Sequence, residues 1–204
     1  LVGGIILIIA TDRNNSGAGR ELNDLSAEQL KIQADEALSA ARYEDAVERY
    51  RSLIKTGTND PAVYRDLGRS LIALKRHDEA LEPLRQAVYL TSSRQSQDVL
   101  LLAGTFRHLR QYERALETLR VGLHNNPEDL ALHLERVRVL TAMNDTNQAI
   151  AAAGAIHQIH PEHSENSLNY ARLLEKAGRR RDALEIYIDI IDTHALQQGY
   201  SGAI

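Results

Sequence analysis

Apolar and small residues recur along most of this chain at a spacing that returns them to one face of a helix. Five of its alanines are separated by steps of 34, 35, 34 and 34 residues, and apolar or small residues follow each of the five at +4 and +7. Positions related by +4 and +7 lie on one stripe of an α-helix. The alanines are Ala46, Ala80, Ala115, Ala149 and Ala183. The pattern therefore predicts five copies of one helical element.

A second helix is predicted ahead of each alanine. Small residues, with one valine, recur 12 positions earlier, at Ala34, Gly68, Ala103, Val137 and Ala171, and an apolar residue follows each three positions later. Small side chains let two helix backbones approach closely. Pro61, Pro127 and Pro161 fall between the copies, because proline cannot continue a preceding helix. We therefore expect ten antiparallel helices over residues 27–197, with a slight kink at Pro83 inside one of them.

The period and these positions resemble the tetratricopeptide repeat, a helix-turn-helix of about 34 residues. The clearest copy holds Tyr64, the pair Leu67–Gly68 and the pair Ala80–Leu81 in the family's order. The resemblance implies an all-α fold, a tetratricopeptide solenoid of about five repeats. The repeats are placed at 27–60, 61–94, 96–129, 130–163 and 164–197, with one inserted residue at position 95, and residues 198–204 form a tail.

The first ten residues carry no charged and no polar side chain. A membrane-spanning helix needs about 20 apolar residues, and the chain begins with Leu1. We therefore expect residues 1–10 to be the end of a transmembrane anchor whose upstream part is missing, followed by a polar linker at 11–26. The apolar part of a signal peptide and a buried strand packed on the array are alternatives.

The flank of this segment balances two arginines against two acids, so it carries no strong cytoplasmic signal. The expected location is a bacterial inner membrane, with the repeats in the periplasm. The chain has no cysteine and a formal charge of −4. The charge and the lack of aromatic residues in the expected groove argue against nucleic-acid binding.

No recognised catalytic motif is present, so neither enzymatic activity nor a cofactor is expected. His157, His160 and His163 are three residues apart, but Pro161 interrupts their helix, and we expect no metal site. The run Arg179–Arg181 is expected to be a solvated turn.

In tetratricopeptide arrays the first helix of each repeat lines a concave groove, and the resemblance implies which positions face it. The predicted groove residues are Lys31, Arg65, Arg69, Leu100, Arg107, Leu134, Arg138, Leu168, Arg172 and Lys176. Arginine forks bind carboxylates and leucines accept apolar anchors. The expected partner is a protein or peptide with acidic and apolar residues. Alternatively, the arginines form a solvated face paired with neighbouring acids.

Some family members hold a C-terminal carboxylate in a five-residue clamp. Only Lys31 matches that clamp, because Asp35, Asp66, Gln97 and Leu101 occupy its other positions. We therefore do not expect a chaperone-tail adaptor of that type.

Two functions remain open from the sequence. The first is a membrane-tethered scaffold that recruits or positions a partner in a membrane-associated complex. The second is a structural subunit packed permanently within a large secretion, pilus, respiratory or assembly complex. The last helix carries more apolar surface than one neighbouring helix covers, at Leu184, Ile186, Tyr187, Ile188, Ile190 and Ile191. We expect a continuing chain, a partner or a second copy to cover that face.

Overall fold

The computed structural model describes residues 26–197, and side chains as far as Asp192. The predicted anchor and nearly all of the predicted linker lie outside the described residues, as does the tail. Between residues 26 and 197 the chain forms ten α-helices and no strand, which confirms the predicted all-helical fold of ten helices. None of the helices in that range combines the length and the apolar character needed to cross a membrane.

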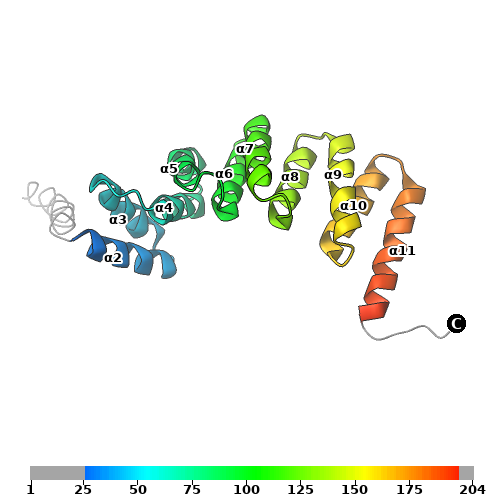
Figure 1. The fold of residues 1–204 in the computed structure, drawn as a ribbon, viewed down its shortest axis with the longest axis horizontal. Coiled ribbons are helices and arrows are strands. Elements are labelled where there is room, and N and C mark those ends of the chain that lie inside the picture. Colours follow the sequence, from blue (N-terminus) through cyan, green and yellow to red (C-terminus); the bar gives the residue numbers. More distant parts are fainter. Residues whose placement is uncertain (1–25, 198–204) are drawn as a thin grey trace, which may run out of the picture. The chain divides into compact units, whose positions relative to one another are not determined.

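The chain divides after Ser92 into two compact units, here called the N-terminal and C-terminal units. Neighbouring helices in each unit form antiparallel pairs joined by short turns (Figure 1). The N-terminal unit holds α2 (Ala27–Ser39), α3 (Tyr43–Lys55), α4 (Pro61–Ala73) and α5 (His77–Leu90). The C-terminal unit holds α6 (Ser96–His108), α7 (Tyr112–Asn125), α8 (Leu130–Ala142), α9 (Thr146–Ile159), α10 (Ser164–Lys176) and α11 (Arg180–Gln197).

Polar residues before several helices satisfy the free N–H groups of the first turn. Ser26 and Gln29 form a reciprocal capping box at the start of α2. Asp60 accepts the Ala62 N–H over 2.9 Å, and Pro61 supplies the first residue of α4. Asp129 caps α8 in the same manner. Local sequence therefore determines where these helices begin.

The turn inside each repeat has one left-handed residue at an equivalent position. These residues are Ala41, Lys75, Arg110, Asn144 and Gly178, with φ between 56° and 79°. The next N–H reaches back to the carbonyl five residues earlier, as from Arg76 to Leu71 over 2.8 Å. This is the hydrogen bond of a Schellman motif, which ends one helix and turns the chain into the next.

The recurring positions of the repeat pattern supply much of the core. All five recurring alanines are at most 1% exposed. Gly68 on α4 lies directly against the buried Leu84 of α5, and Gly122 on α7 lies against Val99 of α6. Helix α5 runs through Pro83 without interruption. Each fully buried leucine or valine stabilises the fold by about 1.5 to 3 kcal/mol, so the repeated apolar stripe holds each unit together.

Candidate functional site

A pocket of about 220 Å³ lies between the first helices of the last two repeats, α8 and α10, in the C-terminal unit. Its lining combines apolar, basic, acidic and amide side chains: Leu134, Val137, Arg138, His163, Glu165, Asn166, Asn169 and Arg172. Leu134, Arg138 and Arg172 are among the predicted groove residues. The fold therefore brings together two arginines and a leucine that are distant in sequence.

The two arginines of this pocket differ in their partners. Arg138 Nη1 donates to Glu135 Oε2 over 3.2 Å, and the same carboxylate accepts Arg107 Nε over 2.7 Å. The Glu135 side chain is only 6% exposed, so two guanidinium groups neutralise a nearly buried charge. Arg172 is exposed and makes no ion pair with any side chain that the structure describes. Its guanidinium is therefore available to an anionic ligand.

Four polar residues of the pocket were not predicted: His163, Glu165, Asn166 and Asn169. Glu165 is exposed on the first turn of α10. His163 Nδ1 accepts the Asn166 N–H over 3.2 Å and so caps α10. The buried Asn166 donates its amide to the Ala153 carbonyl over 3.1 Å. Asn169 is half-buried on the same face. Asn166, Asn169 and Arg172 are three residues apart on α10, and this spacing is the sequence signal that was available.

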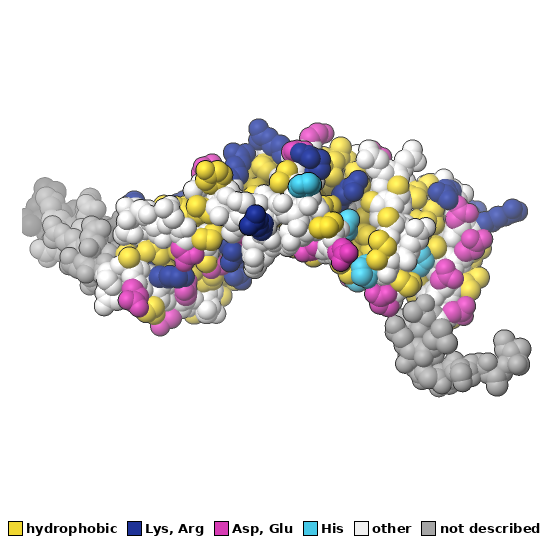
Figure 2. Space-filling view, in the orientation of Figure 1, with side chains coloured by type: hydrophobic (Ala, Val, Ile, Leu, Met, Phe, Trp, Pro, Cys, Tyr) yellow, Lys and Arg dark blue, Asp and Glu magenta, His cyan; other side chains and the backbone are white. Residues whose placement is uncertain are grey.

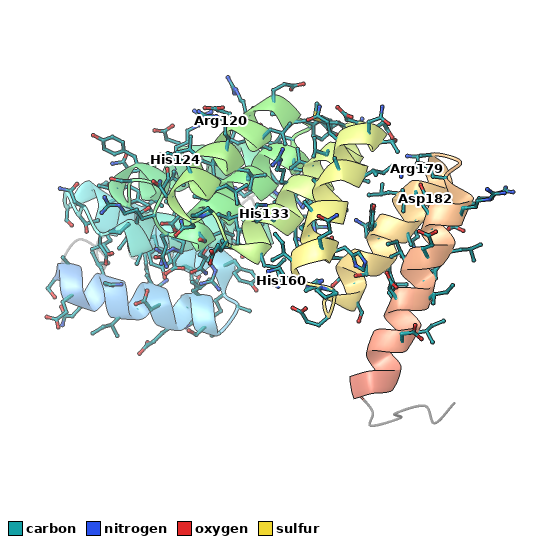
Figure 3. The ribbon with its side chains drawn as sticks, turned by 45° about the vertical axis from the view of Figure 1, so that its right-hand side comes forward. Arg120, His124, His133, His160, Arg179 and Asp182 are labelled. Atoms are coloured by element: carbon teal, nitrogen blue, oxygen red, sulfur yellow. The ribbon has the colours of Figure 1, made fainter. Side chains whose placement is uncertain are left out.

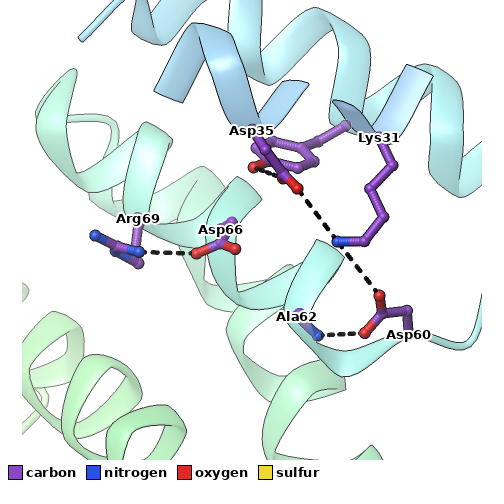
Figure 4. Close-up of polar contacts among 7 residues, drawn as sticks. Lys31, Asp35, Asp60, Ala62, Asp66 and Arg69 are labelled. Carbon is purple, nitrogen blue, oxygen red and sulfur yellow. Dashed lines mark hydrogen bonds and ion pairs between the residues drawn. The ribbon is translucent and has the colours of Figure 1, made fainter. Parts of the chain in front are cut away.

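Two predicted basic residues of the N-terminal unit, Lys31 and Arg69, have acidic partners of their own. Lys31 Nζ lies 3.5 Å from Asp35 and 3.6 Å from Asp60, and Arg69 lies 3.0 Å from Asp66 (Figure 4). Arg65, also in this unit, is half-buried. The ion pairs match the alternative interpretation, in which basic residues pair with neighbouring acids.

Asp35 also forms a hydrogen bond with a core residue of the N-terminal unit. The fully buried Tyr50 donates its hydroxyl to Asp35 Oδ1 over 2.7 Å. Burial of the phenol, together with its hydrogen bond to Asp35, raises the pKa of Tyr50 far above its usual range. Asp35 therefore has a structural role, since one carboxylate oxygen accepts from Tyr50 and the other lies near Lys31.

The remaining predicted groove residues do not line the pocket. Leu100 is half-buried on α6, whereas Leu168 and Lys176 are exposed on α10. Arg107 is connected to the pocket only through Glu135.

A second, more apolar pocket of about 410 Å³ lies among α8, α9 and the segment before α8. His133 and His160 are two of its lining residues (Figure 3). His133 Nε2 lies 2.7 Å from the Pro127 carbonyl oxygen, and His160 Nδ1 lies 3.1 Å from Glu162. His157 instead contacts Ser167 over 2.7 Å. In the part of the chain that the structure describes, no three potential metal ligands come together.

Comparison with known proteins identifies the repeat. Two family models described as "Tetratricopeptide repeat" match residues 33–96 and 140–201. A curated relative from Mycosarcoma maydis, "Small glutamine-rich tetratricopeptide repeat-containing protein 2", is 27% identical over 135 residues. That match covers 63% of this chain and 38% of the relative, so the chain corresponds to well under half of that protein.

Solved structures share the fold at low sequence identity. "Crystal structure of MamA protein" is 16% identical, with a TM-score of 0.76 over 87% of this chain and 97% of that one. "MamA 41-end from Desulfovibrio magneticus RS-1" is 15% identical, with a TM-score of 0.72 over 84% of this chain and 96% of that one. At such identities the likeness concerns the fold alone.

Proposed function

Because this chain belongs to the tetratricopeptide-repeat family, we propose that it is a non-enzymatic scaffold whose α8–α10 pocket binds an acidic and apolar peptide segment. Proteins with these repeats generally mediate protein–protein interaction. The single observation that carries the proposal is the arrangement of Arg138 and Arg172 beside Leu134 and Val137 in one pocket. An apolar side chain of the peptide enters the pocket, and a neighbouring carboxylate contacts Arg172.

The size of the pocket favours a side chain over a cofactor. Sites for small-molecule ligands usually enclose about 300 to 1,000 Å³, whereas this pocket encloses about 220 Å³. The half-buried amide of Asn169 lies beside the arginines and offers both a donor and an acceptor to a peptide backbone. The site therefore suits one anchored residue of an extended chain.

Binding of fluorescent peptides, measured by anisotropy, tests this function. The peptides pair leucine or isoleucine with aspartate or glutamate, and matched peptides carry asparagine or glutamine instead. Arg172→Ala should weaken binding of the acidic peptides about tenfold or more, because a hydrogen bond to a charged group contributes about 1.5 to 3 kcal/mol. Arg120→Ala is the control, since Arg120 is exposed on α7 and paired with Glu117.

Equal binding of acidic and amide peptides would show that the arginines do not recognise carboxylates. Equal binding by the Arg172→Ala protein and the unchanged protein would show that partners bind elsewhere. Substitution of a groove residue outside this pocket, such as Arg69→Ala, should change peptide binding little, because the Arg69 guanidinium already pairs with Asp66.

The proposal includes tethering of the scaffold to a membrane through residues 1–10. Its support is the sequence of that segment, which lies outside the described residues. Alkaline extraction of membranes from cells that make the protein tests it, with an antibody against the repeats. Recovery in the extracted soluble fraction would contradict tethering. Protection of the repeats from protease added to intact spheroplasts would contradict a periplasmic position.

The alternative function is a permanently packed structural subunit. Exposed apolar residues on α11 favour it, because such a face usually marks an interface. A subunit of this kind would co-purify in fixed ratio with its neighbours, whereas a scaffold would bind its peptide reversibly.

A further inference from the structure

Helix α11 has an apolar stripe on the side that faces away from the core. Leu184, Ile188 and Ile191 are 60%, 55% and 65% exposed. Their spacing of four and three residues places them on one face of the helix. On the other side of α11, Ala183 is buried and Ile186 packs against the core of the C-terminal unit. The stripe therefore remains exposed after α11 has packed against the C-terminal unit.

Charged residues of opposite sign stand at the two ends of this stripe. Arg180 and Arg181 precede Leu184, and Asp192 follows Ile191; all three charged side chains are exposed. Figure 2 shows basic side chains at the start of α11 and acidic ones further along it. At about 100° per residue, Arg181 and Asp192 fall on the same flank of the stripe. Neither makes an ion pair with a described side chain.

A different pair satisfies the charges beside the turn that precedes α11. Arg179 Nε donates to Asp182, three residues later, at the start of the helix (Figure 3). Asp182 is therefore already paired, and Arg180 and Arg181 are the basic groups next to the apolar stripe, with Arg181 on the flank that also holds Asp192.

We propose that the α11 stripe is a self-association surface on which a second copy of this chain docks, with the two α11 helices antiparallel. A two-fold axis near residues 186–188 places Leu184 of each copy close to Ile188 and Ile191 of the other. The same axis places Arg181 of each copy opposite Asp192 of the other, because antiparallel helices bring like flanks together. A parallel arrangement would instead bring the two basic ends to one level and the two acidic ends to another.

This self-complementarity identifies the occupant. Two-fold dimers use one patch twice, so the patch must match its own inverted image in shape and charge. The stripe meets this condition with apolar residues in the middle, Arg181 at one end and Asp192 at the other. The exposed Glu185 and Asp189 lie on the same flank but further round α11 from the stripe. The contact is small, and interfaces below about 1,200 Å² in total are typical of weak association. We therefore expect a dimer that depends strongly on concentration.

Sedimentation velocity of the full chain over a concentration series tests the surface. Ile188→Glu should abolish the concentration-dependent rise in sedimentation coefficient, because it places a carboxylate in the stripe. Ile32→Glu is the matched control, since Ile32 is 52% exposed on α2 in the other unit, and it should associate like the unchanged chain. A chain that stays monomeric at millimolar concentration would overturn the proposal. Association unaffected by Ile188→Glu would also overturn it, because another segment would then be responsible.

A charge exchange tests the antiparallel arrangement. Arg181→Asp alone and Asp192→Arg alone should each weaken association at least fivefold, since each change sets like charges opposite one another at two places in the dimer. The protein with both substitutions should associate nearly as well as the unchanged chain. Failure of the double substitution to restore association would overturn the antiparallel pairing. Circular dichroism of each protein should show the same helix content, because all these side chains are exposed.

Discussion

Arg107 on α6 donates its Nε–H to the carboxylate of Glu135 on α8 over 2.7 Å, 28 residues along the chain. Glu135 also accepts Arg138 Nη1, so its nearly buried carboxylate connects successive repeats and orients one arginine of the proposed binding pocket. Burying a carboxylate is costly unless charged or hydrogen-bonding partners compensate it.

Glu135→Gln should destabilise the C-terminal unit by about 2 kcal/mol, because the amide cannot accept two charge-assisted hydrogen bonds in place of the carboxylate. Urea unfolding followed by circular dichroism measures the change. Glu117→Gln removes an exposed partner of Arg120 and should change stability by less than about 0.5 kcal/mol. Similar effects of the two substitutions would show that burial of Glu135 does not matter.

Gly68→Ala should destabilise the N-terminal unit by about 1 to 3 kcal/mol. A Cβ at this position would lie 2.6 Å from Cγ of the fully buried Leu84. Gly104→Ala is the matched control in a helix, because its Cβ would meet only Glu135 Oε1 at an ordinary 3.7 Å. That change should stabilise the protein by up to about 1 kcal/mol through helix propensity. Thermal unfolding measures both changes, and a Gly68→Ala protein as stable as the unchanged protein would contradict the packing described for α4 and α5.

Lys75→Gly should stabilise the protein by about 0.5 to 1 kcal/mol. Lys75 has φ of 60°, a left-handed conformation that only glycine adopts without steric cost. Lys75→Ala separates this effect from loss of the side chain and should give no gain. Conversely, Gly178→Ala should destabilise the equivalent turn, where φ is 79°. Denaturant midpoints of the three proteins provide the comparison.

Glu79 should remain ionised well into the acid range. Hydrogen bonds from Arg76, and then from Arg51, lower its pKa from the ordinary 4.5 to about 2. A carboxylate with a lowered pKa stabilises the folded state above its unfolded pKa, and this contribution is lost as the pH falls from about 4.5 toward 2. The carboxyl ¹³C chemical shift should titrate with a midpoint near 2.

Arg76→Gln and Arg51→Gln should each raise that midpoint, whereas Arg85→Gln should leave it unchanged, because Arg85 pairs with Glu82. A midpoint near 4.5 in the unchanged protein would show that the ion pairs do not persist in solution. High salt should also raise the midpoint, since the pairs are exposed.

The fold was predictable because the information for it is local and repeated. Ala115 occupies the same place in its repeat as Ala46, and both are completely buried. A small residue at a helix contact is required in every copy, so five occurrences make the signal clear. Capping residues such as Asp60 are equally local, since they bond to the backbone two or three residues later. The left-handed turn residues gave no comparable signal, because only the last of the five is glycine.

The candidate site was predictable only in part. The repeat register identified Leu134, Arg138 and Arg172 as surface residues of first helices, and they line one pocket. The same register also selected Lys31 and Arg69, which have acidic partners. Whether an arginine is free depends on which acids lie nearby in space. Asp66 is three residues from Arg69, whereas Glu135 reaches Arg107 from another repeat.

The sequence by itself determined the all-helical repeat, the starts of several helices and the apolar stripe of each helix, because each depends on interactions within about one helical turn or on a strict period. Tertiary structure alone decided that Glu135 is buried between two arginines, that Arg172 has no described acidic partner, and that Leu184, Ile188 and Ile191 remain exposed. These properties arise from the distances between side chains on different helices. A one-dimensional pattern specifies which face a residue occupies, but not what packs against that face.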